Sequence, residues 1–237
     1  MGFIINKLAD LEDFNQVARA VIREELLKTK SMLDERGLPY CSQMQDHWLK
    51  LWEYSGAIIE SRLDKRMTVL DAGGAGSVLS YYMALEGCVV HTVDLLPQKV
   101  ENTKKVAEAL GLQMYSSIQD ITNLDYADGY FDSVYGICVI EHILESNQPI
   151  AMKELGRVLR PGGVLAITFD YGKDAAEYPI LAADEVYSRL VLPSGLEILG
   201  NRDFYAMSND LGGSSLDYTF GALFLRKPGR LSFSAID

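Results

Sequence analysis

The sequence predicts an α/β protein built on a doubly wound, mostly parallel β-sheet with helices on both faces. From residue 67 onward, short runs rich in β-forming residues alternate with longer runs of helical period, as in sheets whose strands are joined by crossover helices. Residues 68–85 also contain an apolar run, a glycine-rich turn and a second apolar run at helical spacing. A strand, turn and helix in this order present free backbone N–H groups to a nucleoside cofactor.

The glycine-rich turn carries most of the functional signal. Val69 and Leu70 belong to a run too short for a helix, so a buried strand is expected to end at the turn. Asp71 stands before the first glycine, where it suits a cationic or hydroxyl-bearing ligand better than a pyrophosphate. Asp94 ends the next expected strand, where an acid can accept both ribose hydroxyls of a nucleoside. The alternative is a turn whose glycines serve packing alone.

Two helices are expected before the first strand. Residues 8–36 repeat apolar side chains near a period of 3.6 and are followed by Gly37 and Pro39, which stop a helix. Residues 45–62 are expected to be helical, with Trp48 and Trp52 on one face. This second segment is interpreted as a helix that packs on the domain, a cap over the cofactor cleft, or a dimer interface. The chain is thus divided into an N-terminal helical cap, 1–66, and a cofactor-binding domain, 67–237.

The later elements follow the alternation of strands and helices. Pro97 is favoured in the first turn of a helix, and Gly111 is expected to end that helix. Strands are expected at 67–72, 89–94, 112–115, 131–138, 164–169, 196–199 and 218–225. Helices are expected at 77–86, 97–110, 148–159 and 183–190. Residues 170–179 are expected to form a loop and residues 201–217 a surface hairpin connection.

The composition limits the classes of partner. The 237 residues carry a net charge of −11, which argues against nucleic acid because its binding needs a basic surface. The three cysteines show no metal-ligand spacing and suit buried thiols in a reducing cytoplasm. The sequence shows no signal-peptide pattern and no apolar run long enough to span a membrane. A cytoplasmic protein without a membrane partner is therefore expected.

Five motifs occur in a fixed order between about residues 67 and 170. They are Asp71-Ala-Gly-Gly-Ala-Gly76, Thr92-Val-Asp94, Gln119-Asp-Ile121, Phe131-Asp-Ser-Val134 with Val139-Ile-Glu-His142, and Val158-Leu-Arg-Pro-Gly-Gly163. Together they resemble the class I S-adenosylmethionine-dependent methyltransferases. The family commonly has Asp-x-Gly-x-Gly-x-Gly, from which this chain departs at Ala75 and Ser77. The resemblance implies a Rossmann-like, seven-stranded sheet whose last strand lies antiparallel beside the fifth.

The resemblance also implies which residues hold S-adenosylmethionine. It places the glycine loop at the methionine part, Asp94 at the ribose hydroxyls, and Asp120 with the Ile121 N–H at the adenine. The Ile137 carbonyl is placed at the methionine ammonium. The full implied set is Asp71, Gly73, Gly74, Gly76, Asp94, Leu95, Asp120, Ile121, Ile137 and His142. For Asp120 a purely structural turn role is the alternative.

Methyl transfer to a hydroxyl acceptor benefits from a base. His142 is the first candidate, followed by Glu141, Asp170 and Tyr171. No metal is expected, because no His, Asp, Glu or Cys triplet has metal-ligand spacing. The expected activity is methyl transfer to an oxygen or nitrogen of a small molecule, by a monomer or homodimer. Two alternatives are a non-catalytic methyltransferase-like module that binds a protein partner and a nicotinamide-dependent oxidoreductase.

Overall fold

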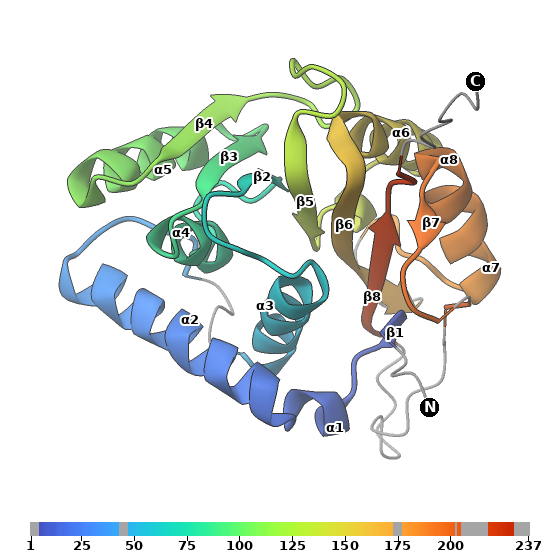
Figure 1. The fold of residues 1–237 in the computed structure, drawn as a ribbon, viewed down its shortest axis with the longest axis horizontal. Helices are drawn as coiled ribbons and strands as arrows, with labels where there is room; N and C mark the ends of the chain where they lie inside the picture. Colours follow the sequence, from blue (N-terminus) through green and yellow to red (C-terminus); the bar gives the residue numbers. More distant parts are fainter. Residues whose placement is uncertain (1–4, 43–46, 173–176, 202, 205–217, 230–237) are drawn as a thin grey trace, which may run out of the picture.

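A single mixed sheet of eight strands forms the centre of the protein (Figure 1). The computed structural model describes residues 5–42, 47–172, 177–201, 203–204 and 218–229. The strands are β1 (Lys7–Leu8), β2 (Thr68–Ala72), β3 (Val89–Asp94), β4 (Met114–Ile118), β5 (Phe131–Ile137), β6 (Leu159–Gly172), β7 (Glu197–Ile198) and β8 (Tyr218–Arg226). The helices are α1 (Leu11–Phe14), α2 (Val17–Glu35), α3 (Trp48–Glu60), α4 (Val78–Leu85), α5 (Pro97–Leu110), α6 (Gln148–Val158), α7 (Ala183–Glu185) and α8 (Leu192–Ser194).

The strand order is β1-β8-β6-β5-β2-β3-β4, and β7 also pairs with β8. The five strands from β6 to β4 are mutually parallel, whereas β8 runs antiparallel to β6. This confirms the parallel, doubly wound sheet and the antiparallel last strand. The strand count differs from the expected seven because β1 adds an eighth strand.

Strand β1 corrects the expected helix at 8–36. Lys7 and Leu8 pair with Ala222 and Gly221 of β8, and a regular helix begins only at Val17 after the short α1. Asp10 is the N-cap of α1 and accepts a hydrogen bond from the Glu12 N–H at 2.7 Å. A side chain that bonds the backbone in this way favours a helix start over a helix interior.

Two short strands share the outer edge of β8. β1 pairs near Ala222, and β7 pairs with Leu225 and Arg226. The fully buried Asn6 lies between them: its amide donates to the Leu199 carbonyl at 2.7 Å, and its Oδ1 accepts from the Phe224 N–H at 2.6 Å. Asn6 therefore satisfies the backbone of β8 where neither short strand reaches, and it fastens the N-terminal segment to the sheet.

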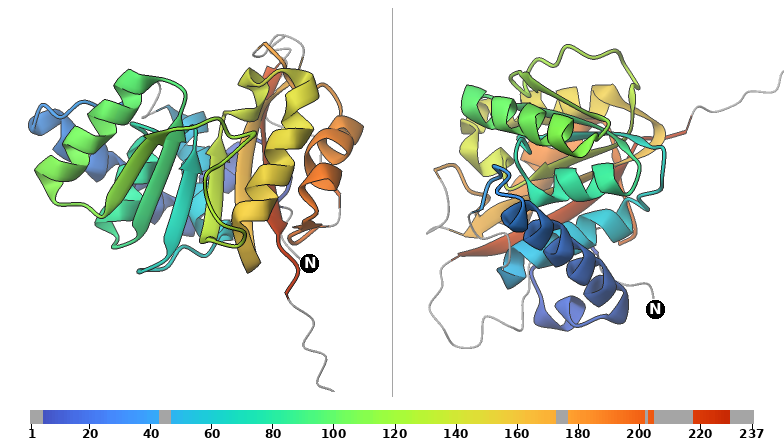
Figure 2. Two further views of the ribbon diagram at one scale, coloured as in Figure 1. Left: turned by 90° about the horizontal axis from the view of Figure 1, so that it is seen from above. Right: turned by 90° about the vertical axis from the view of Figure 1, so that its left-hand side faces the viewer.

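Helices cover both faces of the sheet, as the two views in Figure 2 show. One apolar core contains side chains of α2, α3, α4 and α5 packed on the sheet, and the other contains α6 and the helical segment 183–194. Eight consecutive residues of α3, from Leu51 to Ile58, are buried. The segment before the first long strand thus supplies part of a helical layer, directly on the sheet.

Several element boundaries differ from the sequence-based expectation. β6 reaches Gly172 and so includes the first residues of the expected loop at 170–179, while β4 lies at 114–118 instead of 112–115. The last helix continues to Ser194 through a π-helical turn, Val186–Val191. Gly111 ends α5 in the left-handed conformation, φ 63°, as predicted. Most of the expected hairpin connection at 201–217 lies outside the described residues.

Gly156→Ala is expected to lower the free energy of unfolding by about 1–3 kcal/mol, as overpacked cores do. A Cβ at Gly156 would overlap the carbonyl oxygen of Ser194, where α6 contacts α8. Urea denaturation followed by circular dichroism measures the change. The control is Lys153→Ala on the exposed side of α6, expected to stay within about 0.5 kcal/mol of the parent. Equal stability of the two variants would contradict the close contact of these helices.

Candidate active site

Two adjoining pockets lie at the carboxyl ends of the parallel strands, where open α/β sheets bind ligands. The first, of about 320 Å³, is called the Glu141 pocket, and the second, of about 460 Å³, the Asp94 pocket. Gly73, Lys99, Cys138 and His142 line both. A ligand of nucleoside size that fills one pocket can therefore reach into the other past these four residues.

The glycine loop after β2 is shaped by a buried carboxylate. Asp71 accepts hydrogen bonds from the hydroxyls of Ser77 at 2.9 Å and Ser80 at 2.6 Å. Burial raises the pKa of Asp71 to about 6. A Cβ at Gly74 would overlap this carboxylate, and Gly73 has φ 76°, which side-chain-bearing residues rarely adopt. The loop therefore needs both glycines in order to fold over Asp71.

Gly76 departs from its expected place in the cofactor set. It lines neither pocket, and its carbonyl accepts a hydrogen bond from the Cys41 N–H at 2.8 Å. Its φ of 85° explains why glycine stands there. Its contact fastens the segment before α3 to the loop, and Cys41 itself joins the lining of the Glu141 pocket.

The Asp94 pocket brings together four residues predicted to hold a nucleoside. These are Asp94, Leu95, Asp120 and Ile121. Asp94 accepts from the Leu96 N–H at 3.0 Å, and its other carboxylate oxygen lies 3.5 Å from the Lys99 ammonium. Asp120 accepts from the N–H and the hydroxyl of Thr122, both at 2.8 Å. Asp120 therefore has the turn role considered as an alternative, and it lines the pocket as well.

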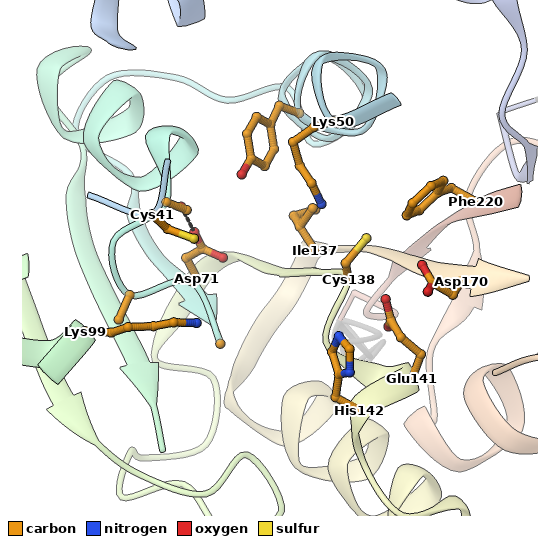
Figure 3. Close-up of a pocket in the computed structure, with 15 residues that line it drawn as sticks. Cys41, Lys50, Asp71, Lys99, Ile137, Cys138, Glu141, His142, Asp170 and Phe220 are labelled. Carbon is orange, nitrogen blue, oxygen red and sulfur yellow. Dashed lines mark hydrogen bonds between the residues drawn. The ribbon is translucent and has the colours of Figure 1, made fainter. Parts of the chain in front are cut away.

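The Glu141 pocket gathers three acid–base candidates from two strand ends (Figure 3). Glu141 and His142 belong to the 3-10 turn Ile140–His142 after β5, and Asp170 lies near the end of β6. Glu141 is fully buried, and neither of its carboxylate oxygens has a hydrogen-bond partner among the described residues. Burial, and then the charge of Asp170, raise the pKa of Glu141 to about 8. His142 is exposed and lies where the two pockets meet.

Tyr171 is the catalytic candidate that the structure does not bring into the site. It lines neither pocket, and its ring lies 6.0 Å from that of Phe204. Adjacent residues of a strand point to opposite faces. Because β6 continues to Gly172, Asp170 and Tyr171 cannot both face the same pocket.

Helix α3 carries a charged pair that was not predicted from the sequence. Lys50 and Glu53 form an ion pair of 2.8 Å, and the Lys50 ammonium lies 5.8 Å from the ring centroid of Tyr54 and 6.0 Å from that of Phe220. Burial alone would lower the pKa of Lys50, but the charge and hydrogen bond of Glu53, together with Cys138 and Tyr54, outweigh it and hold this pKa well above its ordinary value. The sequence did contain a signal for this pair, because a lysine and a glutamate stand at i and i+3 within a helix that is rich in aromatic and apolar residues.

Glu53 also reaches the two strand ends. Its Oε1 accepts from the Thr168 hydroxyl at 2.5 Å and from the Cys138 thiol at 2.7 Å. Cys138 has φ 51°, a left-handed conformation, and its N–H donates to the Thr168 carbonyl at 3.1 Å. Backbone strain of this kind persists only where surrounding contacts enforce it.

The fold also gathers groups that no spacing along the chain indicated. Cys138, Glu141 and Asp170 each direct one potential metal-ligand atom to within 4.8 Å of the others. Burial raises the pKa of the Cys138 thiol well above its usual range. A metal binds the thiolate, so Cys138 would have to lose its proton and its hydrogen bond to Glu53 to join such a site. The expectation of no metal stays a prediction.

Comparison with known proteins finds methyltransferase relatives. Residues 70–167 match the model of a methyltransferase domain family. The chain is 26% identical over 148 residues to the tRNA 5-carboxymethoxyuridine methyltransferase of Escherichia coli K12, covering 60% of this chain and 55% of that protein. It is 30% identical over 128 residues to the ubiquinone biosynthesis O-methyltransferase of Coxiella burnetii RSA 493, covering 54% and 53%. The chain thus spans about half the length of the curated relatives it matches.

Two solved structures share the fold over most of the chain. The [4+2]-cyclase SpnF has a TM-score of 0.64 at 19% identity, covering 90% of this chain and 98% of that one. A putative sarcosine dimethylglycine methyltransferase from Galdieria sulphuraria has a TM-score of 0.61 at 16% identity, covering 84% and 98%. At these identities the likeness shows the fold alone.

The sheet order defines a Rossmann-like fold, and the two pockets lie at the carboxyl ends of its strands. The match of residues 70–167 to a methyltransferase domain and the methyltransferase relatives support the resemblance to the class I S-adenosylmethionine-dependent methyltransferases. The residues present fit S-adenosylmethionine as cofactor, because acids line the nucleoside half and the glycine loop leaves the approach to Ile137 open. Among the described residues, no helix is long and apolar enough to cross a membrane.

Glu141→Gln is expected to stabilise the protein more at high pH than at low pH. A carboxyl whose pKa rises from 4.5 to about 8 on folding binds more protons in the folded state between these values. Stability therefore falls as the pH rises through this window, and the amide variant lacks this loss. The thermal midpoint should exceed that of the parent by more at about pH 8 than at about pH 5.

The matched control for this prediction is Glu145→Gln, which makes the same charge change at an exposed position four residues on. Its effect on the thermal midpoint should be small and nearly independent of pH. If the thermal midpoint of Glu141→Gln exceeds that of the parent by the same amount at about pH 5 and at about pH 8, this result would contradict the raised pKa of Glu141.

Asp94→Asn is expected to weaken S-adenosylhomocysteine binding by at least about tenfold, because a hydrogen bond to a charged group is worth about 1.5–3 kcal/mol. Isothermal titration calorimetry measures the affinity, and circular dichroism checks that the fold is kept. Glu101→Gln, on the exposed side of α5, is the control. Unchanged affinity in Asp94→Asn would remove Asp94 from the cofactor site.

Proposed function

We propose that this protein transfers the methyl group of S-adenosylmethionine to an oxygen or nitrogen of a small molecule. The observation that carries the proposal is the junction of the two pockets. The acids of the nucleoside half lie in one pocket, and a buried carboxylate without a hydrogen-bond partner lies in the other. A methyl donor that lies across the junction would direct its sulfonium toward Glu141, where an acceptor can approach.

The donor half is assigned from position and residue type. Asp94 would accept the ribose hydroxyls, and Asp120 with Ile121 would meet the adenine. Gly73 and Ile137 would lie beside the methionine part, with Asp71 holding the loop. Lys99 must share Asp94 with the ribose, since it lies 3.5 Å from that carboxylate.

In the acceptor half the protein has to align the acceptor with the methyl group, exclude water and remove a proton. Alignment of the reactants supplies up to about 7–11 kcal/mol of a barrier in favourable cases. Glu141 is proposed as the base, since a carboxylate with a pKa of about 8 is a stronger base than an ordinary one. His142 is proposed to line the junction, and Asp170 to lie beside the acceptor. Lys50 and Tyr54 of α3 would close the pocket opposite them.

A small-molecule acceptor is favoured over RNA, although one relative is named for a tRNA. The Glu141 pocket is lined in part by buried side chains, and the net charge is −11. A polyanion would approach such a protein against its charge. The same charge leaves a neutral or cationic small molecule free to enter.

The direct test is incubation with methyl-labelled S-adenosylmethionine and a cell extract. The extract is divided into a small-molecule fraction and an RNA fraction, and each is analysed by mass spectrometry. Label in the small-molecule fraction supports the proposal. Label confined to RNA would overturn the substrate class, and no label in either fraction would favour the non-catalytic module.

Glu141→Gln is expected to lower kcat by about 100-fold or more and to leave the affinity for S-adenosylhomocysteine nearly unchanged. The rate of the parent protein should rise with pH through about 8, as the carboxyl ionises, and this limb should be absent from the variant. His142→Gln should mainly raise KM. If instead His142→Gln abolishes turnover while Glu141→Gln keeps the pH limb, the base is His142.

A further inference from the structure

The charged side chains around the Glu141 pocket differ in how they are neutralised. Lys50 is paired with Glu53, and Lys99 lies beside Asp94. Asp71 is held by two serine hydroxyls. Glu141 has no hydrogen-bond partner among the described residues, and it lies next to a second carboxylate, Asp170. Glu141 is therefore a titratable side chain of this pocket that the described residues leave without a hydrogen bond.

A fully buried carboxylate without a partner is unfavourable unless it is protonated or meets a ligand. Its oxygens are directed into the pocket, toward Asp170 (Figure 3). A ligand with a positive charge and several N–H donors would satisfy Glu141 and can donate to the neighbouring Asp170 carboxylate as well. An alcohol brings one donor and no charge.

The same pocket already holds one ammonium group in a suitable environment. The Lys50 ammonium lies beside a carboxylate and within 6.0 Å of the ring centroids of Tyr54 and Phe220. Both rings belong to residues that line the pocket. Aromatic faces attract cations more strongly when water is excluded, and the Lys50 charge is balanced by Glu53, so an organic cation can also approach these rings.

We propose that the methyl acceptor is an amine, which Glu141 and Asp170 bind as its ammonium form. This inference rests on the proposed methyl transfer and names the class of its substrate. A divalent metal is the other cation to consider. It is less favoured because the third group of the cluster, Cys138, donates a hydrogen bond to Glu53 and would have to lose both this bond and its proton to become a ligand.

The carboxylate pair also suits the chemistry of an amine acceptor. The bound ammonium gives one proton to Glu141, which leaves a neutral amine with a free electron pair. The nitrogen lone pair forms the new N–C bond while the S–C bond of S-adenosylmethionine breaks. The two electrons of the S–C bond stay on sulfur, which gives the neutral thioether. The positive charge passes from sulfur to the methylated nitrogen, which Asp170 faces, and Glu141 then releases its proton to solvent.

The test compares a matched pair of probes, benzylamine and benzyl alcohol, by calorimetry on the protein saturated with S-adenosylhomocysteine. The buffer contains EDTA. The amine is expected to bind at least about tenfold more tightly than the alcohol, as a charge-assisted hydrogen bond allows. Equal affinity for the two probes, or tighter binding of the alcohol, would overturn the inference.

Two variants test which side chains cause the preference for the amine. In Glu141→Gln the affinities for benzylamine and benzyl alcohol should differ by no more than about threefold, since the amide accepts less strongly than the ion. Asp170→Asn, at a half-buried position, should also reduce the preference, and this variant keeps the test valid if Glu141→Gln does not fold. Glu145→Gln makes the same substitution at an exposed site and should keep the preference. Retention of the preference in both Glu141→Gln and Asp170→Asn would contradict the assignment.

Proton release provides a readout that a purely structural role would not change. Near neutral pH, amine binding should displace a proton from Glu141, so the measured heat should vary with the ionisation enthalpy of the buffer. Benzyl alcohol should show no such dependence. Amine binding that appears only after Mg²⁺ or Zn²⁺ is added would assign the carboxylates to a metal and overturn the inference.

The binding of S-adenosylhomocysteine, measured before either probe is added, separates this inference from the proposed function. If S-adenosylhomocysteine does not bind, the proposed methyl transfer fails. If it binds and the protein does not prefer the amine, only the substrate class fails.

Discussion

The buried carboxylate of Glu53 joins helix α3 to the two strand ends that form the acceptor pocket. It pairs with Lys50 on its own helix and accepts from Thr168 of β6 and from Cys138 at the end of β5. Removing one partner of a buried ion pair is typically destabilising by about 3–5 kcal/mol, because the other charge is left unpaired. This network fixes how far α3 lies from the sheet, and it helps to hold Cys138 in its left-handed conformation. The position of the turn that carries Glu141 depends on the placement of α3 and on the conformation of Cys138.

A second buried network supports that turn from the opposite side. Gln148, fully buried at the start of α6, donates to the carbonyls of Ile140 and Ile143 at 3.0 and 3.1 Å. Its own carbonyl oxygen accepts two hydrogen bonds from Arg189, at 2.9 and 2.6 Å. The backbone on both sides of Glu141 is thus held by satisfied polar groups. The carboxylate between them has no such partner, and buried groups left in this state often belong to functional sites.

The contrast between Glu53 and Glu141 separates structural from chemical use of a buried charge. Both are fully buried glutamates near one pocket. Glu53 has three partners and fastens elements together, whereas Glu141 is directed into the space that a substrate would occupy. The N-terminal segment likewise has one part that stabilises the sheet and another that lines the pocket. Asn6 and β1 complete the edge of β8, and α3 brings Lys50 and Tyr54 to the pocket.

The sequence by itself determined the parallel α/β sheet and the class of cofactor, and it predicted most of the residues that line the candidate site. Strand ends in a parallel sheet meet at one edge, so Asp94 and Asp120 could be placed together from their positions after successive strands. Only the tertiary structure decided the rest. A two-residue strand such as β1 has no periodicity to detect, and Tyr171 was misassigned because the continuation of β6 turns it away from Asp170. The sequence indicated a helix over Lys50 and Glu53, but the packing of that helix determines which face meets the pocket. Glu141 and Asp170 lie on different strand ends. The burial of Glu141, which contributes most to its raised pKa, and its proximity to Asp170 exist only once β5 and β6 are paired.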